Sequence, residues 1–178
     1  MEEFIRDYAM TAALLGMFAF AWFGWAQQDP PKSKKWPIAL GIGSGVNFLI
    51  ATAGGLIAWK NWGGPSVLKA DGAFENYMAI FIIEFVVIAL ATLITFYIRK
   101  QKYIATIVSF IVGVHFFPLA PVFQDNAYYL LAVMVTAASI IPLFISKKVG
   151  ISIVTLTGVG VGTSLFIFAI RGLIMAIS

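Results

Sequence analysis

Six long apolar stretches follow one another along the chain, and polar or turn-forming segments separate them. The stretches cover residues 8–26, 37–59, 77–98, 103–123, 127–145 and 151–177. Each is close to the roughly 20 residues that a helix needs to cross the ~30 Å hydrocarbon core of a bilayer. The pattern therefore predicts an all-α, polytopic integral membrane protein, a bundle of six transmembrane helices with short loops.

The composition leaves little room for another class of protein. Of the 178 residues, 61% are hydrophobic and only 11% are charged, whereas about 25% of the residues of a typical soluble domain are charged. Six spans use most of the chain, so we expect no folded domain outside the membrane. We therefore treat residues 1–178 as a single transmembrane helical domain.

The basic residues predict how the helices are oriented. Eight of the twelve Lys and Arg residues lie in the first, third and fifth connections, and basic residues in short loops are retained on the cytoplasmic side. We therefore expect both termini to be non-cytoplasmic, in the cell (plasma) membrane. The net charge of +4 follows from these loops, so it does not indicate nucleic-acid binding.

Glycine recurs at short spacings inside two of the spans. The glycines are Gly41 and Gly45 in the second span, and Gly158, Gly160 and Gly162 in the sixth. No phosphate-binding Lys follows either group, so a nucleotide-binding loop is not predicted. Small residues four positions apart let helix backbones approach closely, which predicts helix packing within the chain or between copies of it. Asn47 is expected to make an interhelical hydrogen bond, and a pore-lining role is the alternative.

Glu84 is an acidic residue deep inside a predicted span. It lies seven residues beyond Tyr77, about 10 Å along the third helix from its non-cytoplasmic end. A charge at this depth costs about 2.5 to 3.5 kcal/mol on insertion scales, so it faces the bundle and finds a partner. The functional interpretation is a carboxylate that binds a proton or a cation, with Tyr77 on the same helix face. The alternative is a structural ion pair or hydrogen bond.

His115 in the fourth span is at nearly the same predicted depth as Glu84, which permits contact between the two side chains without showing it. Pro118 and Pro121 follow it, and each removes a backbone donor. The helix carbonyls left unpaired predict a hydrated, irregular end to this span. A hydrogen-bonded structural role is the alternative to ligand or proton binding by the histidine.

Arg171 comes late in the sixth stretch, on a face that carries Thr157, Gly160 and Ser164. The functional interpretation is a clamp for an anion or for the carboxylate of a substrate. The alternative is an anchor that snorkels to the interface or forms a salt bridge. Its expected partners are Glu84, Asp7 and Glu75.

Signatures of catalysis are missing from the sequence. With one His and no Cys, a His/Cys zinc site or an H-E-x-x-H motif cannot form from this chain alone. No nucleophile elbow is present, and Glu84 is the only carboxylate at depth. The sequence therefore favours a function other than an enzyme, and it identifies no metal or cofactor.

Two hypotheses for the function remain. In the first, the chain is a proton-linked transporter or channel-like permease, and Glu84, His115, Arg171 and Tyr77 form a polar pocket that opens to the non-cytoplasmic side and takes a small molecule or ion. In the second, it is a non-transporting membrane partner: an accessory subunit, an assembly factor, a sensor or a protective binding protein. Its glycine faces would then dock another membrane protein or a second copy.

Overall fold

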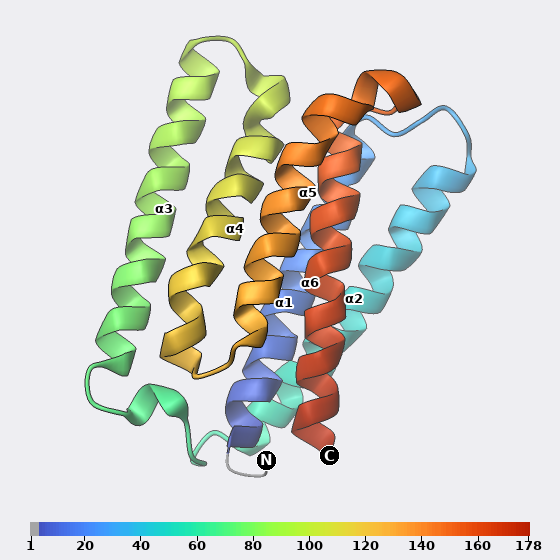
Figure 1. The fold of residues 1–178 in the computed structure, drawn as a ribbon. Coiled ribbons are helices and arrows are strands. Elements are labelled where there is room, and N and C mark those ends of the chain that lie inside the picture. Colours follow the sequence, from blue (N-terminus) through green and yellow to red (C-terminus); the bar gives the residue numbers. More distant parts are fainter. Residues whose placement is uncertain (1–3) are drawn as a thin grey trace.

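The structure is a computed structural model, and it describes residues 4–178 as an all-α bundle of six long helices (Figure 1). The helices are α1 (Ile5–Trp25), α2 (Lys35–Lys60), α3 (Ala73–Tyr97), α4 (Ile104–Phe123), α5 (Ala127–Val149) and α6 (Ile153–Ile177). Three single 3₁₀ turns lie in the connections: η2 (Ala26–Gln28), η3 (Val67–Lys69) and η4 (Gln101–Tyr103).

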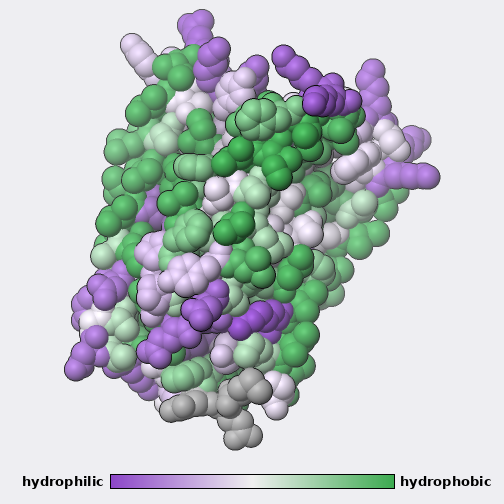
Figure 2. Space-filling view, viewed as in Figure 1, coloured by the Kyte–Doolittle hydropathy of each residue, from purple (hydrophilic) through white to green (hydrophobic). Residues whose placement is uncertain are grey.

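All six helices are long and apolar enough to cross a membrane. Apolar side chains cover the middle of the molecule, and hydrophilic ones gather toward its two ends (Figure 2). Large apolar residues such as Leu49, Leu93 and Phe144 are exposed on this surface, where acyl chains replace water. The chain is therefore an integral membrane protein in contact with the lipid bilayer.

Close contact between α1, α2 and α6 forms the centre of the bundle. The buried residues of α1 toward these neighbours are small, including Ala9, Ala12 and Gly16. A Cβ atom built on Gly54 would lie 2.7 Å from Ala9 O, and one on Gly172 would lie 2.9 Å from Tyr8 O. The helix backbones touch here, because neither position has room for a side chain.

The glycines singled out in the sequence lie in two different environments. A Cβ atom on Gly158 would lie 2.8 Å from Trp22 O, one on Gly160 would lie 2.9 Å from the Ala138 side chain, and one on Gly162 would lie 3.1 Å from Phe23. These three glycines are at contacts between helices. Gly41 and Gly45, in contrast, are exposed on α2 with no other atom within 4 Å of an added Cβ, so the expected packing within the chain does not occur there.

Asn47 is buried, but it does not make the interhelical hydrogen bond that its position suggested. Its Nδ2 donates to Gly43 O of its own helix at 2.9 Å, and its Oδ1 is buried without a partner. The reason is that α1 approaches α2 here with its backbone: an added Cβ on Gly16 would lie 3.1 Å from Asn47 O. Small residues on this face of α1 offer Asn47 no polar side chain.

The other three helices extend the bundle in a row, with α5 on α6, α4 on α5 and α3 on α4 (Figure 1). Of the α3 side chains, Glu84 and Thr95 are buried. The irregular end predicted for the fourth span is wrong, because α4 continues through Pro118 and Pro121 to Phe123. Neighbouring helices and the remaining hydrogen bonds hold this regular geometry despite the two missing donors.

Both termini of the described chain lie at the same end of the bundle, as an even number of spans requires (Figure 1). The basic connections after α1, α3 and α5 lie at the opposite end. We expect a membrane-impermeant maleimide to label Asp71→Cys in intact cells and Ser33→Cys only after permeabilisation, since both positions are exposed and the chain has no cysteine of its own. The reverse labelling pattern would contradict the expected orientation.

Gly54 and the neighbouring Gly55 provide a matched test of the close packing between α1 and α2. An added methyl group at Gly54 meets the α1 backbone, whereas at Gly55 no atom lies within 4 Å. We expect Gly54→Ala to lower the free energy of unfolding in mixed micelles by about 1 to 3 kcal/mol. Gly55→Ala should leave it unchanged or raise it slightly, because Ala favours the helix. Equal stability of the two variants would show that the helices are not in contact at Gly54.

Candidate functional site

A groove with a volume of about 650 Å³ lies between α1, α3 and α4. This volume is within the range of about 300 to 1,000 Å³ for sites that hold small molecules. The groove is lined on α1 from Arg6 to Trp25, on α3 from Phe74 to Ile88, and on α4 from Val108 to Phe123. Because a helix rises about 1.5 Å per residue, the groove follows α1 for roughly 28 Å, most of the thickness of a bilayer.

The groove exists because α3 packs on α4 and on the η3 turn, and not extensively on α1. The closest contacts of α1 with α2 and α6 are made by small residues such as Ala9 and Ala12. The face toward the groove carries larger residues, such as Leu14, Phe18 and Trp22. On α3 the groove face carries Tyr77, Phe81 and Phe85, spaced by one helical turn. Aromatic rings from both helices therefore line most of its length.

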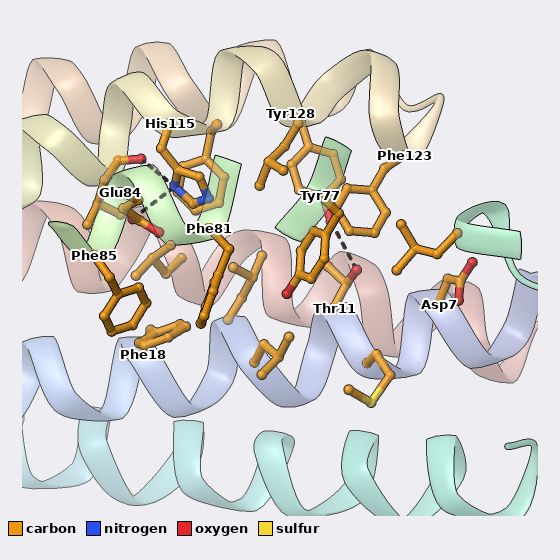
Figure 3. Close-up of a pocket in the computed structure, with 18 of the residues that line it drawn as sticks. Asp7, Thr11, Phe18, Tyr77, Phe81, Glu84, Phe85, His115, Phe123 and Tyr128 are labelled. Carbon is orange, nitrogen blue, oxygen red and sulfur yellow. Dashed lines mark hydrogen bonds and ion pairs between the residues drawn. The ribbon is translucent and has the colours of Figure 1, made fainter. Parts of the chain in front are cut away.

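Glu84 and His115 meet on the wall of the groove (Figure 3). The Nδ1 atom of His115 lies 3.0 Å from Oε1 of Glu84 and 3.2 Å from the carbonyl oxygen of Val112. A hydrogen on Nδ1 can be donated to either of these oxygen atoms, and in that tautomer Nε2 is an acceptor. The side chains of Glu84 and His115 are 9% and 16% exposed, so the pair is largely shielded but can still be reached from the groove.

The position of the pair in the bundle decides what it can do. Glu84 is the twelfth residue of the 25-residue helix α3, so it lies near mid-depth. Figure 3 shows Phe81 and Phe85 near it on the same helix and Phe18 across the groove on α1, and the ring centroids of Phe81 and Phe85 are 4.5 Å apart. A carboxylate and an imidazole that face aromatic rings can bind a proton or a cation, which are the two functions expected of Glu84.

The other charged residues of the groove lie toward the end where the termini are, and each contacts protein atoms. Arg6 lies 3.4 Å from Asp7 and donates to Trp62 O. Asp7 accepts from Val67 N at 2.7 Å, and Lys69 donates to Gly64 O at 2.9 Å. Among the groove residues that the structure describes, Glu84 and His115 are thus the charged or readily charged pair at depth.

Tyr77 also lines the groove, one helical turn from Phe81. Its ring meets Phe123 edge-on, with the centroids 5.9 Å apart. Sequence reasoning missed two further groups in the groove, Thr11 and Tyr128, whose hydroxyl oxygens are 3.1 Å apart. They lie on helices distant in sequence, so no spacing could have found them.

Arg171 lies outside the groove, so the structure does not bring it together with Glu84 and His115. Its partner is Asp125, at 2.7 Å from NH1 to Oδ2 and 3.2 Å from NH2 to Oδ1, instead of the expected Glu84, Asp7 or Glu75. The cause is the short connection between α4 and α5, which places Asp125 against α6. With two hydrogen bonds to one carboxylate, this geometry favours the structural anchor over the anion clamp.

Within residues 4–178, no group of three or more His, Asp or Glu side chains is placed to hold a metal ion. The fold and the groove define a six-helix integral membrane protein with a largely apolar site at mid-depth. Comparison with known proteins adds no relative: no protein-family profile, curated protein or solved structure matches the chain. The function therefore has to be argued from the groove itself.

A double-mutant cycle on Asp125 and Arg171 tests whether this ion pair is a structural anchor. We expect Asp125→Asn and Arg171→Met to lower the free energy of unfolding, and the double variant to lose less than the sum of the two. A coupling of about 1 to 2 kcal/mol is expected for a partly exposed, two-bond ion pair. A double-mutant cycle in mixed micelles measures it, and strict additivity would mean that the pair does not stabilise the bundle.

Proposed function

We propose that this protein is a small proton-linked transporter or channel-like permease, and that protons bind at the pair of Glu84 and His115. One observation carries the proposal: the pair lies near mid-depth in a groove that follows α1 for most of the membrane thickness. Secondary transporters place substrate and coupling-ion sites near the bilayer midplane. An ionisable residue inside the membrane is expensive, and it is a candidate for such a site.

The pair has the chemistry that proton exchange needs. With the hydrogen on Nδ1 directed at Glu84 or at Val112 O, Nε2 accepts a proton and the neighbouring carboxylate stabilises the imidazolium that forms. Several titratable or charged groups line the same groove: Tyr77 on α3, Tyr128 on α5, Arg6 and Asp7 on α1, and Lys69 of η3. Arg6, Asp7 and Lys69 lie toward one end of the groove, so Glu84 supplies the negative charge at depth.

The location of the site in the cell is part of the proposal. The end of the groove lined by Arg6, Asp7 and Lys69 is the end where both termini lie. With the basic connections in the cytoplasm, this end opens to the non-cytoplasmic side of the plasma membrane. Arg171, which was expected in the pocket, takes no part in this site because Asp125 binds it.

A non-transporting membrane partner is the second candidate, and one observation favours it. Gly41 and Gly45 lie on an exposed face of α2 where no atom of the chain is within 4 Å of an added Cβ. A small-residue surface of this kind suits close packing with a second copy or with another membrane protein. In that case the pair of Glu84 and His115 holds α3 on α4 and has no part in transport.

Proton flux in proteoliposomes tests the proposal. Liposomes that contain the purified protein and an internal pH-sensitive dye receive an inward driving force for protons from a potassium gradient and valinomycin. We expect the wild type to acidify the interior faster than protein-free liposomes do, and Glu84→Gln to fall to the protein-free rate, since the neutral amide does not stabilise the imidazolium that carries the proton.

Glu75→Gln is the matched control, because it removes the same charge from an exposed position on the same helix. It should retain the wild-type rate. A Glu84→Gln protein that folds and conducts protons as fast as the wild type contradicts the proposal. That result would favour the second candidate, a non-transporting membrane partner.

A further inference from the structure

We propose that the groove binds an organic ammonium ion, a cation with an apolar body, between the carboxylate of Glu84 and the aromatic rings of Phe18, Phe81 and Phe85. This inference names the class of substrate of the proposed transporter. As a statement about transport it rests on the proposed function, whereas binding of the cation can be tested separately. It starts from a mismatch within the groove. The walls are largely apolar and aromatic, yet a carboxylate is held among them.

Charge selects a cation over an anion at this depth. Glu84 is negative, His115 is its partner at 3.0 Å, and Arg171 is engaged by Asp125 outside the groove. Arg6 and Lys69 lie toward one end, where backbone carbonyls accept their hydrogens. An anion beside Glu84 would meet a like charge in a medium of low dielectric constant, whereas a cation would meet an opposite one.

The aromatic rings select an organic cation over a metal ion or water. The face of an aromatic ring attracts a positive charge within about 6 Å, most strongly where water is excluded. The rings of Phe81 and Phe85 lie one helical turn apart on the same helix as Glu84, tilted by 44° to each other. They supply no oxygen ligand to replace the hydration shell of a small hard ion. A volume of about 650 Å³ accommodates an apolar body as well as the charged nitrogen.

An acyl chain or another neutral lipophile is the main competing occupant, and it explains less of the groove. Such a molecule fills the apolar part but makes no favourable interaction with the carboxylate, which keeps His115 as its partner. The ammonium ion satisfies both features: its body covers the apolar wall, and its charge faces Glu84.

Binding of the cation is expected to displace a proton. When His115 is protonated, the pair of Glu84 and His115 has no net charge and attracts no cation. When the imidazole is neutral, the pair carries one negative charge, so the cation binds and the proton that leaves Nε2 goes to solution. Proton and cation then compete for one site, and each weakens the binding of the other by the same factor. This competition is the physical basis for an exchange of one for the other across the membrane.

The test uses two probes of the same shape, benzyltrimethylammonium and its neutral carbon isostere neopentylbenzene. Trp22, Trp25 and Trp62 line the groove, so tryptophan fluorescence of the protein in nanodiscs reports binding. We expect the cation to bind about tenfold or more tightly than the isostere. Its affinity should fall as the pH is lowered, and its binding should release protons into a weakly buffered solution.

Two variants connect this affinity to the named residues. Glu84→Gln should remove the preference for the cation, and Glu75→Gln should keep it. Should Glu84→Gln fail to fold, Phe81→Leu still tests the site, because it should weaken binding of the cation and leave binding of the isostere unchanged. Equal binding of both probes by the wild type overturns the proposal in favour of a neutral lipophile. If the cation binds and neither Glu84→Gln nor Phe81→Leu weakens its binding, the proposed site is wrong.

Failure of this inference is distinguishable from failure of the proposed function. Binding of benzyltrimethylammonium that depends on Glu84, without proton flux that depends on Glu84 either alone or with the cation loaded inside the liposomes, supports the ammonium site and contradicts transport. Flux that depends on Glu84, without binding of the cation, supports the proton path and contradicts the substrate class. Affinity of the cation that does not change with pH and releases no proton contradicts the competition between the two.

Discussion

The close approach of α1 to α2 and α6 is the contact on which the rest of this bundle depends. Lipid tails are as apolar as leucine, so helices in a membrane associate where small residues let their backbones touch and gain van der Waals contact. Gly54 and Gly172 have no room for a side chain because they lie against the α1 backbone. This contact uses the small-residue face of α1 and turns its larger residues, including Phe18 and Trp22, toward α3. The groove is thus a direct consequence of how α1 is packed.

The other wall of the groove is held more loosely. Helix α3 packs mainly on α4, and Glu84 is one of its two buried residues. Burial of this carboxylate is tolerated because His115 lies 3.0 Å away on α4, so this pair helps to hold α3 in place. The proposed binding of a proton is compatible with this contact, since protonation of the pair also changes the charge between α3 and α4.

Much of the fold could be predicted because the bilayer restricts the possible solutions. Each expected span is a helix whose ends are within a few residues of the expected ones: α3 begins at Ala73 instead of 77, and α5 ends at Val149 instead of 145. Errors occurred where a residue had a choice of partners. The expected partner of Arg171 was Glu84, Asp7 or Glu75, but Asp125 in a short connection binds it. Asn47 donates to a carbonyl of its own helix, because the backbone of α1 lies close to it at Gly16.

The sequence by itself determined the class of protein, the number of spans and the depth of Glu84 and His115, because these follow from the length and polarity of contiguous segments in a slab of fixed thickness. The tertiary structure decided which faces meet. It turned Gly158 inward and Gly41 outward, and it assembled the groove from α1, α3 and α4. The physical reason is that a span's hydropathy fixes its depth but not its rotation, which depends on side chains from helices far away in the sequence.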